Sequence, residues 1–185
     1  RRGLPIPRID AALITNIAED HLGQYGINTI AGLTATKFIV AKALDEAGIL
    51  VLNADDSELV RVGSAIDKTK CWFSTNENNP ILVEHLSKNG AICFVRDGIM
   101  MYQDTQGSSE IIAVNDVPMT FSGAAKHNIQ NALGAIGLAK SLNIADEAIR
   151  VGLGGFRSDA ADNPGRGNVF EVKDATVIMD FAHNE

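Results

Sequence analysis

Short apolar runs alternate along the chain with longer segments in which apolar residues recur at helical spacing. The runs have the length of buried strands, and the segments between them have the length of the helices that connect parallel strands. The pattern therefore predicts an α/β fold with a mostly parallel sheet flanked by helices. We expect strands at residues 11–17, 49–52, 70–74, 91–96, 99–103, 110–114, 168–172 and 176–181. We expect helices at residues 28–47, 57–64, 80–89, 124–142 and 145–153.

Glycine and proline residues mark several of the expected boundaries. Gly48 stands where the first helix would end, and Pro80 stands at the start of a later helix. Asp97 and Gly98 separate two strands, and this dipeptide is typical of a tight hairpin turn. The strands at residues 91–114 therefore predict a small β-rich edge on the α/β body.

The composition is that of one globular domain. Of the 185 residues, 45% are hydrophobic and only 5% are aromatic, so the core must be largely aliphatic. The formal net charge of −7 argues against nucleic acid or an anionic membrane as the main partner, although a nucleotide can bind at a local site. Cys71 and Cys93 lie in apolar stretches and fit no metal-binding spacing, so we expect buried thiols in a reducing cytoplasm.

The ends of the chain carry no targeting signal that we recognise. No apolar run reaches the length of about 18–20 residues that a membrane span requires. The first ten residues lack the apolar core of a signal peptide and an initiator Met, so we expect an excised segment.

Polar residues follow the first expected strand. Glu19, Asp20 and His21 come directly after it, and ligands of α/β sheets bind at the carboxyl ends of strands. These side chains could hold a divalent metal or position a phosphate, or they could be a helix cap with solvated charges. Lys37 and Lys42 on the following helix could neutralise a phosphate or could be ordinary surface lysines.

Two more polar clusters have the same ambiguity. Asp55 and Asp56 follow the second strand, where either could be the N-cap of the helix at residues 57–64. Asn128 and Asn131 are three residues apart at the start of the long helix, so they share a face. Two such amides could read the edge of a base, or they could bridge neighbouring elements.

The last third of the chain presents an arginine and a carboxylate. Arg166 lies in a Gly- and Pro-containing loop, where its guanidinium could bind phosphate or carboxylate, or could simply be a surface group. Asp180 and His183 follow the final strand, where an Asp can accept hydrogen bonds from ribose hydroxyls and a His can contact phosphate.

Taken in order, these segments resemble the Mur ligase superfamily. The succession is ITNIAEDHLGQYG, ATK, VLNADD, SGAAKHNIQNALGA, NPGRGN and DFAHN, and it covers nearly the whole chain. Three stretches are more similar to the ligase half of the cyanophycin synthetase branch: RRGL, FSTNENNPILVEHLSKNGAICFVRDG and DNPGRGN. The resemblance implies a central ATP-binding domain related to the P-loop NTPases.

The resemblance also implies ATP and Mg²⁺ as cofactors. His21 matches a magnesium ligand, and Lys37 matches a lysine that many members carry as a carbamate, which can then hold magnesium. Arg166 matches the arginine that reaches the terminal phosphate, so Lys37 and Arg166 are the expected catalytic residues.

The nucleotide itself is expected to meet a second group of residues. Asn128 and Asn131 match residues near adenine. Asp180 matches the ribose-binding residue, and His183 lies beside the phosphates.

The implied reaction activates a carboxylate as an acyl phosphate and joins an amino acid to it. Arginine is the favoured amino acid, and an aspartate-containing backbone is the favoured acceptor. The alternatives are another Mur or folylpolyglutamate type of ligase, and a non-catalytic binding or assembly domain.

One superfamily feature is missing from the sequence. No stretch fits the P-loop pattern G-x-x-x-x-G-K-[ST], whose backbone amides cradle phosphates. We therefore expect residues 1–172 to be a partial central domain and residues 173–185 to be the truncated start of the C-terminal ligase domain. The isolated chain should be inactive and should bind ATP weakly. Loss of a strand would expose a sheet edge, which would allow a homo-oligomer to form.

Overall fold

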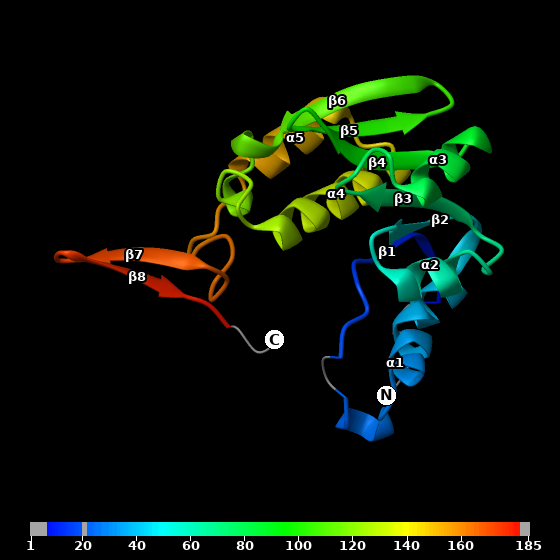
Figure 1. The fold of residues 1–185 in the computed structure, drawn as a ribbon, viewed down its shortest axis with the longest axis horizontal. Helices are drawn as coiled ribbons and strands as arrows, with labels where there is room; N and C mark the ends of the chain where they lie inside the picture. Colours follow the sequence, from blue (N-terminus) through cyan, green and yellow to red (C-terminus); the bar gives the residue numbers. More distant parts are fainter. Residues whose placement is uncertain (1–6, 20–21, 182–185) are drawn as a thin grey trace.

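The computed structural model describes residues 7–19 and 22–181 (Figure 1). Within them, a six-stranded sheet has the order β1-β2-β3-β4-β5-β6, and a separate two-stranded sheet is formed by β7 and β8. Neighbouring strands run parallel from β1 to β4, whereas β5 and β6 are antiparallel. The α/β fold with a β-rich edge is thus confirmed. The strands are β1 Ile9–Ile14, β2 Leu44–Asn53, β3 Thr69–Ser74, β4 Ala91–Arg96, β5 Ile99–Asp104, β6 Gly107–Ala113, β7 Asn168–Val172 and β8 Ala175–Met179.

Helices cover both faces of the large sheet (Figure 1). One face carries the segment after α1 together with α2 and α3, and the other face carries α4 and α5. The bounds are α1 Ile30–Lys37, α2 Ser57–Gly63, α3 Pro80–Ser87, α4 Lys126–Ser141 and α5 Asp146–Gly155. Short 3-10 helices are η1 Gln24–Gly26, η2 Phe38–Lys42, η3 Val114–Asp116 and η4 Pro118–Thr120.

The central strands bury both of their faces. Leu50 and Leu52 pack with the α2 and α3 side, while Val51 between them packs with the α4 side, and all three are 0% exposed. Because side chains alternate across a strand, a strand buried on both faces has a continuous apolar run. The largely aliphatic core that the composition predicts follows from this arrangement.

The two cysteines are buried free thiols, as expected. Their Sγ atoms lie 3.9 Å apart on the face of β3 and β4 that α4 covers. Burial raises the pKa of Cys93 well above its ordinary value, because the low-dielectric core disfavours the thiolate.

The expected helix at residues 28–47 is wrong in its second half. Helix α1 ends at Lys37, a 3-10 turn follows, and β2 already begins at Leu44. Gly48 therefore lies inside a strand and does not end a helix. Its strand has an irregular register with β1, and a Cβ at Gly48 would lie 3.0 Å from the backbone nitrogen of Asp45. A glycine suits this position because the backbone of the same strand approaches closely.

Other local signals are confirmed. Asp97 and Gly98 have φ values of 50° and 77°, which suits the tight turn between β4 and β5. Pro80 occupies the first turn of α3. The first strand, however, begins at Ile9 and ends at Ile14, so the segment that follows it is a loop.

The edge strand β6 is covered in part by a side chain of α5. Arg150 donates from Nε to the carbonyl of Ile111 at 2.8 Å and from a terminal nitrogen to the carbonyl of Glu110 at 3.3 Å. A backbone carbonyl that accepts from a guanidinium is not available to another strand.

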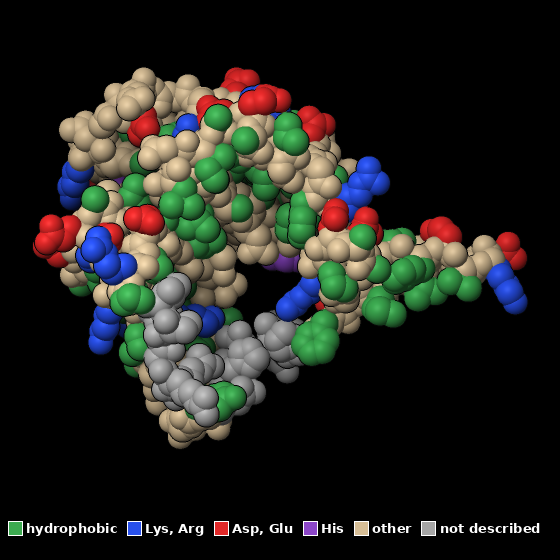
Figure 2. All heavy atoms as spheres, turned by 180° about the vertical axis from the view of Figure 1, so that it is seen from behind, with side chains coloured by type: hydrophobic (Ala, Val, Ile, Leu, Met, Phe, Trp, Pro, Cys, Tyr) green, Lys and Arg blue, Asp and Glu red, His purple; other side chains and the backbone are tan. Residues whose placement is uncertain are grey.

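The β7–β8 hairpin projects from the body of the molecule (Figure 1). Hydrophobic side chains line its surface (Figure 2), and several are at least one-third exposed: Val169, Phe170, Val172, Val177, Ile178 and Met179. The expected division after residue 172 falls in the turn of this hairpin. That division stays a prediction.

Candidate functional site

The carboxyl ends of β1 and β2 are joined by side chains of the VLNADD segment. Asn53 is 2% exposed and donates from Nδ2 to the carbonyl of Thr15 at 3.0 Å. Asp56 accepts from the backbone amide of Ile17 at 2.6 Å, and it also caps α2 by accepting from Leu59 at 2.9 Å. The structural interpretation of Asp56 as an N-cap is confirmed. These contacts fix the loop that leads to Glu19.

Lys37 reaches the same loop from the last turn of α1. Its Nζ donates to the carbonyl of Asn16 at 3.1 Å. The structure therefore places Lys37 beside the loop that leads to His21, the expected magnesium ligand. His21 itself lies outside the described residues. Within the described part of the chain, no group of three His, Cys, Asp or Glu side chains is arranged to hold a metal ion. The magnesium ligands stay a prediction.

Asp55 holds a second set of contacts. Its carboxylate accepts from Ser74 Oγ at 2.6 Å, from the Thr75 backbone amide at 3.1 Å and from Asn79 Nδ2 at 3.1 Å. Gln130 Nε2 of α4 lies 3.4 Å away. Asp55 is thus not a helix cap, but it joins the end of β2 to the end of β3 and to α3 and α4. No local pattern in the sequence indicates these partners.

The two asparagines of α4 meet, as their spacing predicts. Asn131 Nδ2 donates to Asn128 Oδ1 at 3.4 Å, and Asn128 Nδ2 donates to the carbonyl of Met119 at 2.7 Å. Asn128 therefore bridges α4 to the turn that precedes it. This is the second of the two roles that the sequence allows, the bridging of neighbouring elements. The contact of both amides with adenine stays a prediction.

The loop with Arg166 and the end of β8 are brought together. The amide of Gly167 donates to Asp180 Oδ2 at 2.7 Å, and the amide of Phe181 donates to the carbonyl of Gly165 at 2.7 Å. The Arg166 guanidinium lies 5.9 Å from the centre of the Phe181 ring. Two residues that the sequence predicts to share a ligand thus lie in one cluster, while His183 lies outside the described residues.

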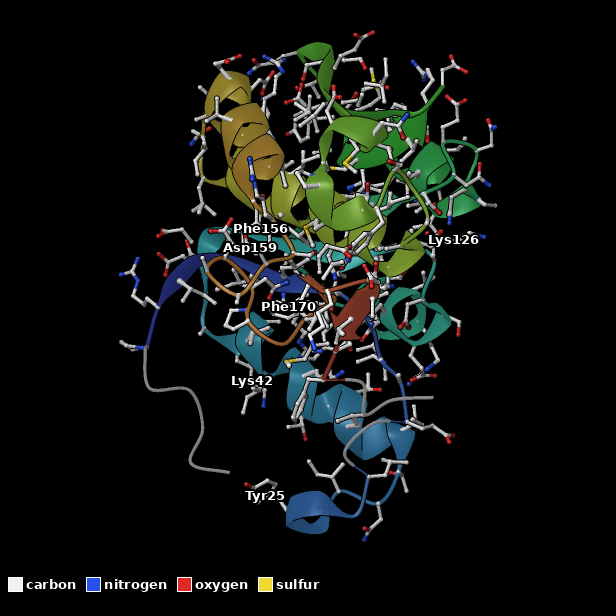
Figure 3. All side chains as sticks on the ribbon, turned by 90° about the vertical axis from the view of Figure 1, so that its left-hand side faces the viewer. Tyr25, Lys42, Lys126, Phe156, Asp159 and Phe170 are labelled. Carbon is white, nitrogen blue, oxygen red and sulfur yellow. The ribbon has the colours of Figure 1, made fainter. Side chains whose placement is uncertain are left out.

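This cluster contacts the start of α4 through an aromatic ring. A Cβ at Gly167 would lie 3.4 Å from Cζ of Phe121, in the turn before α4. Figure 3 views the molecule from the side of the hairpin and labels Asp159 in the loop before β7, Phe170 in the hairpin and, further away, Lys126 at the start of α4. The predicted adenine and ribose residues therefore belong to neighbouring elements.

A histidine far from these strand ends is also held in place. His85 Nε2 lies 3.0 Å from the carbonyl of Lys70, the second residue of β3, so this nitrogen must donate. Burial lowers the pKa of His85, because desolvation disfavours the imidazolium. Lys70, Trp72 and Lys88 line a cavity of about 290 Å³ beside it.

The mostly parallel sheet with helices on both faces defines an α/β domain, and its polar side chains lie at the strand ends, where ligands of such sheets bind. Residues 4–139 match the Mur ligase middle domain family, and the chain belongs to that family. Among the described residues, no helix is long and apolar enough to cross a membrane.

Cyanophycin synthetase from Geminocystis herdmanii is 34% identical over 184 residues, which is 100% of this chain and 21% of that protein. The chain thus spans about a fifth of the length of this curated relative. MurF from Acinetobacter baumannii superposes with a TM-score of 0.62 at 21% identity, covering 94% of this chain and 34% of the other. Escherichia coli FolC in complex with DHPP and ADP superposes with a TM-score of 0.57 at 19% identity, covering 95% and 35%. The two structures share the fold.

Proposed function

We propose that the chain is part of a longer cytoplasmic ATP-dependent ligase that joins arginine to an aspartate-containing acceptor. The observation that carries the proposal is the similarity to cyanophycin synthetase over the whole chain, including every segment that holds a predicted site residue. By their names, its relatives include this synthetase and an Escherichia coli UDP-N-acetylmuramoyl-tripeptide–D-alanyl-D-alanine ligase, which supports the class of reaction more strongly than the identity of the substrates.

The nucleotide would lie across the strand ends. Asn128 and Asn131 would hold the adenine, and Asp180 would accept from the ribose. The proximity of the loop containing Arg166 to Asp180 supports this assignment, because a ribose and its phosphates are adjacent in ATP. His183 would lie beside the phosphates.

Magnesium would be held by His21 and, if it is carbamylated, by Lys37. The contact of Lys37 with the loop after β1 supports a shared site. The metal, when bound, supplies positive charge that offsets the phosphates.

The chain's own residues would act by position and charge. A carboxylate oxygen attacks the γ-phosphorus and ADP leaves, and the amine then displaces phosphate from the acyl phosphate. Arg166 would stabilise the charge on the transferred phosphoryl group. No side-chain nucleophile is required.

A second candidate is a non-catalytic binding or assembly domain, and a longer protein with no P-loop upstream of Arg1 would favour it. Because the given sequence holds no P-loop pattern, we propose that the isolated chain is inactive and binds ATP weakly. Another Mur or folylpolyglutamate type of ligase would share the same fold with different substrates.

The test is phosphate release from ATP by the full-length protein that contains this chain, with magnesium and an aspartate-containing primer. Release that requires arginine, and that is lost in Arg166→Ala and His21→Ala, would support the proposal. Arg96→Ala is the matched control, because that exposed arginine, at the end of β4, pairs with Glu77 in the loop between β3 and α3. Release with a different amine would assign another ligase, and no turnover with any amine would favour the non-catalytic domain.

A further inference from the structure

The turn before α4 has an unusual backbone. Phe121, Ser122 and Gly123 have φ values of 50°, 55° and 88°, so three consecutive residues are left-handed. A glycine adopts this conformation without steric cost, whereas a phenylalanine does not. Left-handed non-glycine residues persist where the surrounding structure determines them, and they concentrate at ligand sites.

The buried residue Thr120 fixes this turn. It is 0% exposed, and its hydroxyl lies 2.8 Å from the carbonyls of both Val114 and Val117. Its own carbonyl accepts from the amides of Gly123 at 3.1 Å and Ala125 at 2.9 Å. The direction of the next residue, Phe121, is therefore set by contacts in the core.

The Phe121 side chain nevertheless does not enter the core. It is 43% exposed, which is a large fraction for an aromatic ring in a rigid turn. One edge of the ring contacts Gly167, whose amide binds Asp180. The same turn is tied to the first residues of α4, because Asn128 donates to the carbonyl of Met119. The ring therefore lies between the turn that Asn128 holds and the Gly167 backbone that binds Asp180.

We propose that Phe121 is a binding residue whose ring stacks on the base of the nucleotide. This inference rests on the proposed function, because it requires a nucleotide between α4 and the loop at residues 163–167. The amides of Asn128 and Asn131 would meet the edge of the base and Phe121 would meet its face. Stacking on an aromatic ring strengthens binding with little dependence on which base is bound.

The experiment is calorimetric titration of the full-length protein with a non-hydrolysable ATP analogue, in wild type and in three Phe121 variants. Phe121→Leu and Phe121→Gly should each raise the dissociation constant about tenfold, in line with the loss of one base–aromatic stack. Phe121→Trp should bind at least as tightly as wild type. The glycine variant also removes the backbone strain, so it should be at least as stable as wild type, and its weaker binding will not reflect misfolding.

Inorganic triphosphate separates stacking from a shift of the Gly167 loop, because it has phosphates and no base. Its affinity should be the same in all variants. Phe156→Leu is the matched control, since Phe156 is 36% exposed and has an extended backbone at the end of α5. Unchanged analogue affinity in Phe121→Leu, or equal weakening for triphosphate, would overturn the inference.

A wrong ligase assignment and a wrong stacking assignment can be distinguished by these measurements. Nucleotide binding that depends on Phe121, without arginine-dependent phosphate release, would leave the stacking inference intact and refute the arginine ligase. Lack of nucleotide binding by wild type would refute both.

Discussion

Gly137→Ala tests how closely α4 packs on the sheet. A Cβ at Gly137 would lie 2.8 Å from Cγ1 of Val51, and near the sulfur atoms of Cys71 and Cys93 at 3.3 and 3.5 Å. Val51 is 0% exposed in a central strand, and its branched side chain has little freedom to move. The helix must therefore shift away from the sheet to admit the methyl group.

The magnitude follows from two opposing effects. Overpacking of a core costs about 1–3 kcal/mol, and the stiff contact places this site in the upper half of that range. Alanine in a helix is favoured over glycine by about 1 kcal/mol. We therefore expect Gly137→Ala to lower the free energy of unfolding by about 1–2 kcal/mol.

Gly152→Ala is the matched control. Gly152 is also helical, but nothing lies within 4 Å of the position of its Cβ, so the substitution should stabilise the protein by up to about 1 kcal/mol. Urea unfolding can be followed by the fluorescence of Trp72, the single tryptophan, which is 3% exposed. The two variants should differ in Tm by several degrees, since each kcal/mol shifts Tm by about 2–4 °C in a chain of this size.

A second substitution identifies the clash itself. Val51→Ala alone should destabilise, but combined with Gly137→Ala it should cost less than the sum of the two effects, because it opens space for the methyl group. The reasoning would be refuted if Gly137→Ala were as stable as Gly152→Ala, or if the two effects simply added.

Two further predictions concern titration and hydrogen bonding. Because burial lowers the pKa of His85, the unfolded state binds the extra proton, so the free energy of unfolding should fall as the pH drops below about 6.5. Equilibrium unfolding measured across pH should show a smaller loss of stability at low pH in His85→Gln, which keeps the hydrogen-bond donor, than in wild type. His127→Gln, at the exposed start of α4, should lose as much stability as wild type. Equal losses in His85→Gln and wild type would contradict this cause. Asp55→Ala should lower the free energy of unfolding by about 1–3 kcal/mol, because the buried Ser74 hydroxyl loses its acceptor. Asp174→Ala in the exposed hairpin turn is the denaturation control, and equal stabilities would refute the role of Asp55.

Much of the fold could be predicted because its signals are local. The run around Val51 and the dipeptide at Asp97 each determine structure within a few residues. The stretch from Phe38 to Gly48 could not be predicted in this way. Its apolar spacing also suits a helix, and what decides the outcome is the pairing of Leu44 with Ile9, 35 residues earlier in the sequence.

In the candidate site, too, local contacts could be predicted and contacts between distant residues could not. The N-cap role of Asp56 depends on the next three residues, and the meeting of Asn128 with Asn131 depends on one helical turn. The approach of Gln130 to Asp55 joins residues 75 positions apart, and no local pattern indicates it. The proximity of Arg166 and Asp180 was expected only from the family resemblance, because each residue alone is an ordinary surface group.

The contacts of Arg150 with β6 protect one edge of the large sheet. Two carbonyls of this terminal strand, those of Glu110 and Ile111, already accept hydrogen bonds from the Arg150 guanidinium. A strand from another molecule would have to displace the guanidinium before it could pair with these two carbonyls. A single charged side chain thus opposes edge-to-edge aggregation at this part of β6.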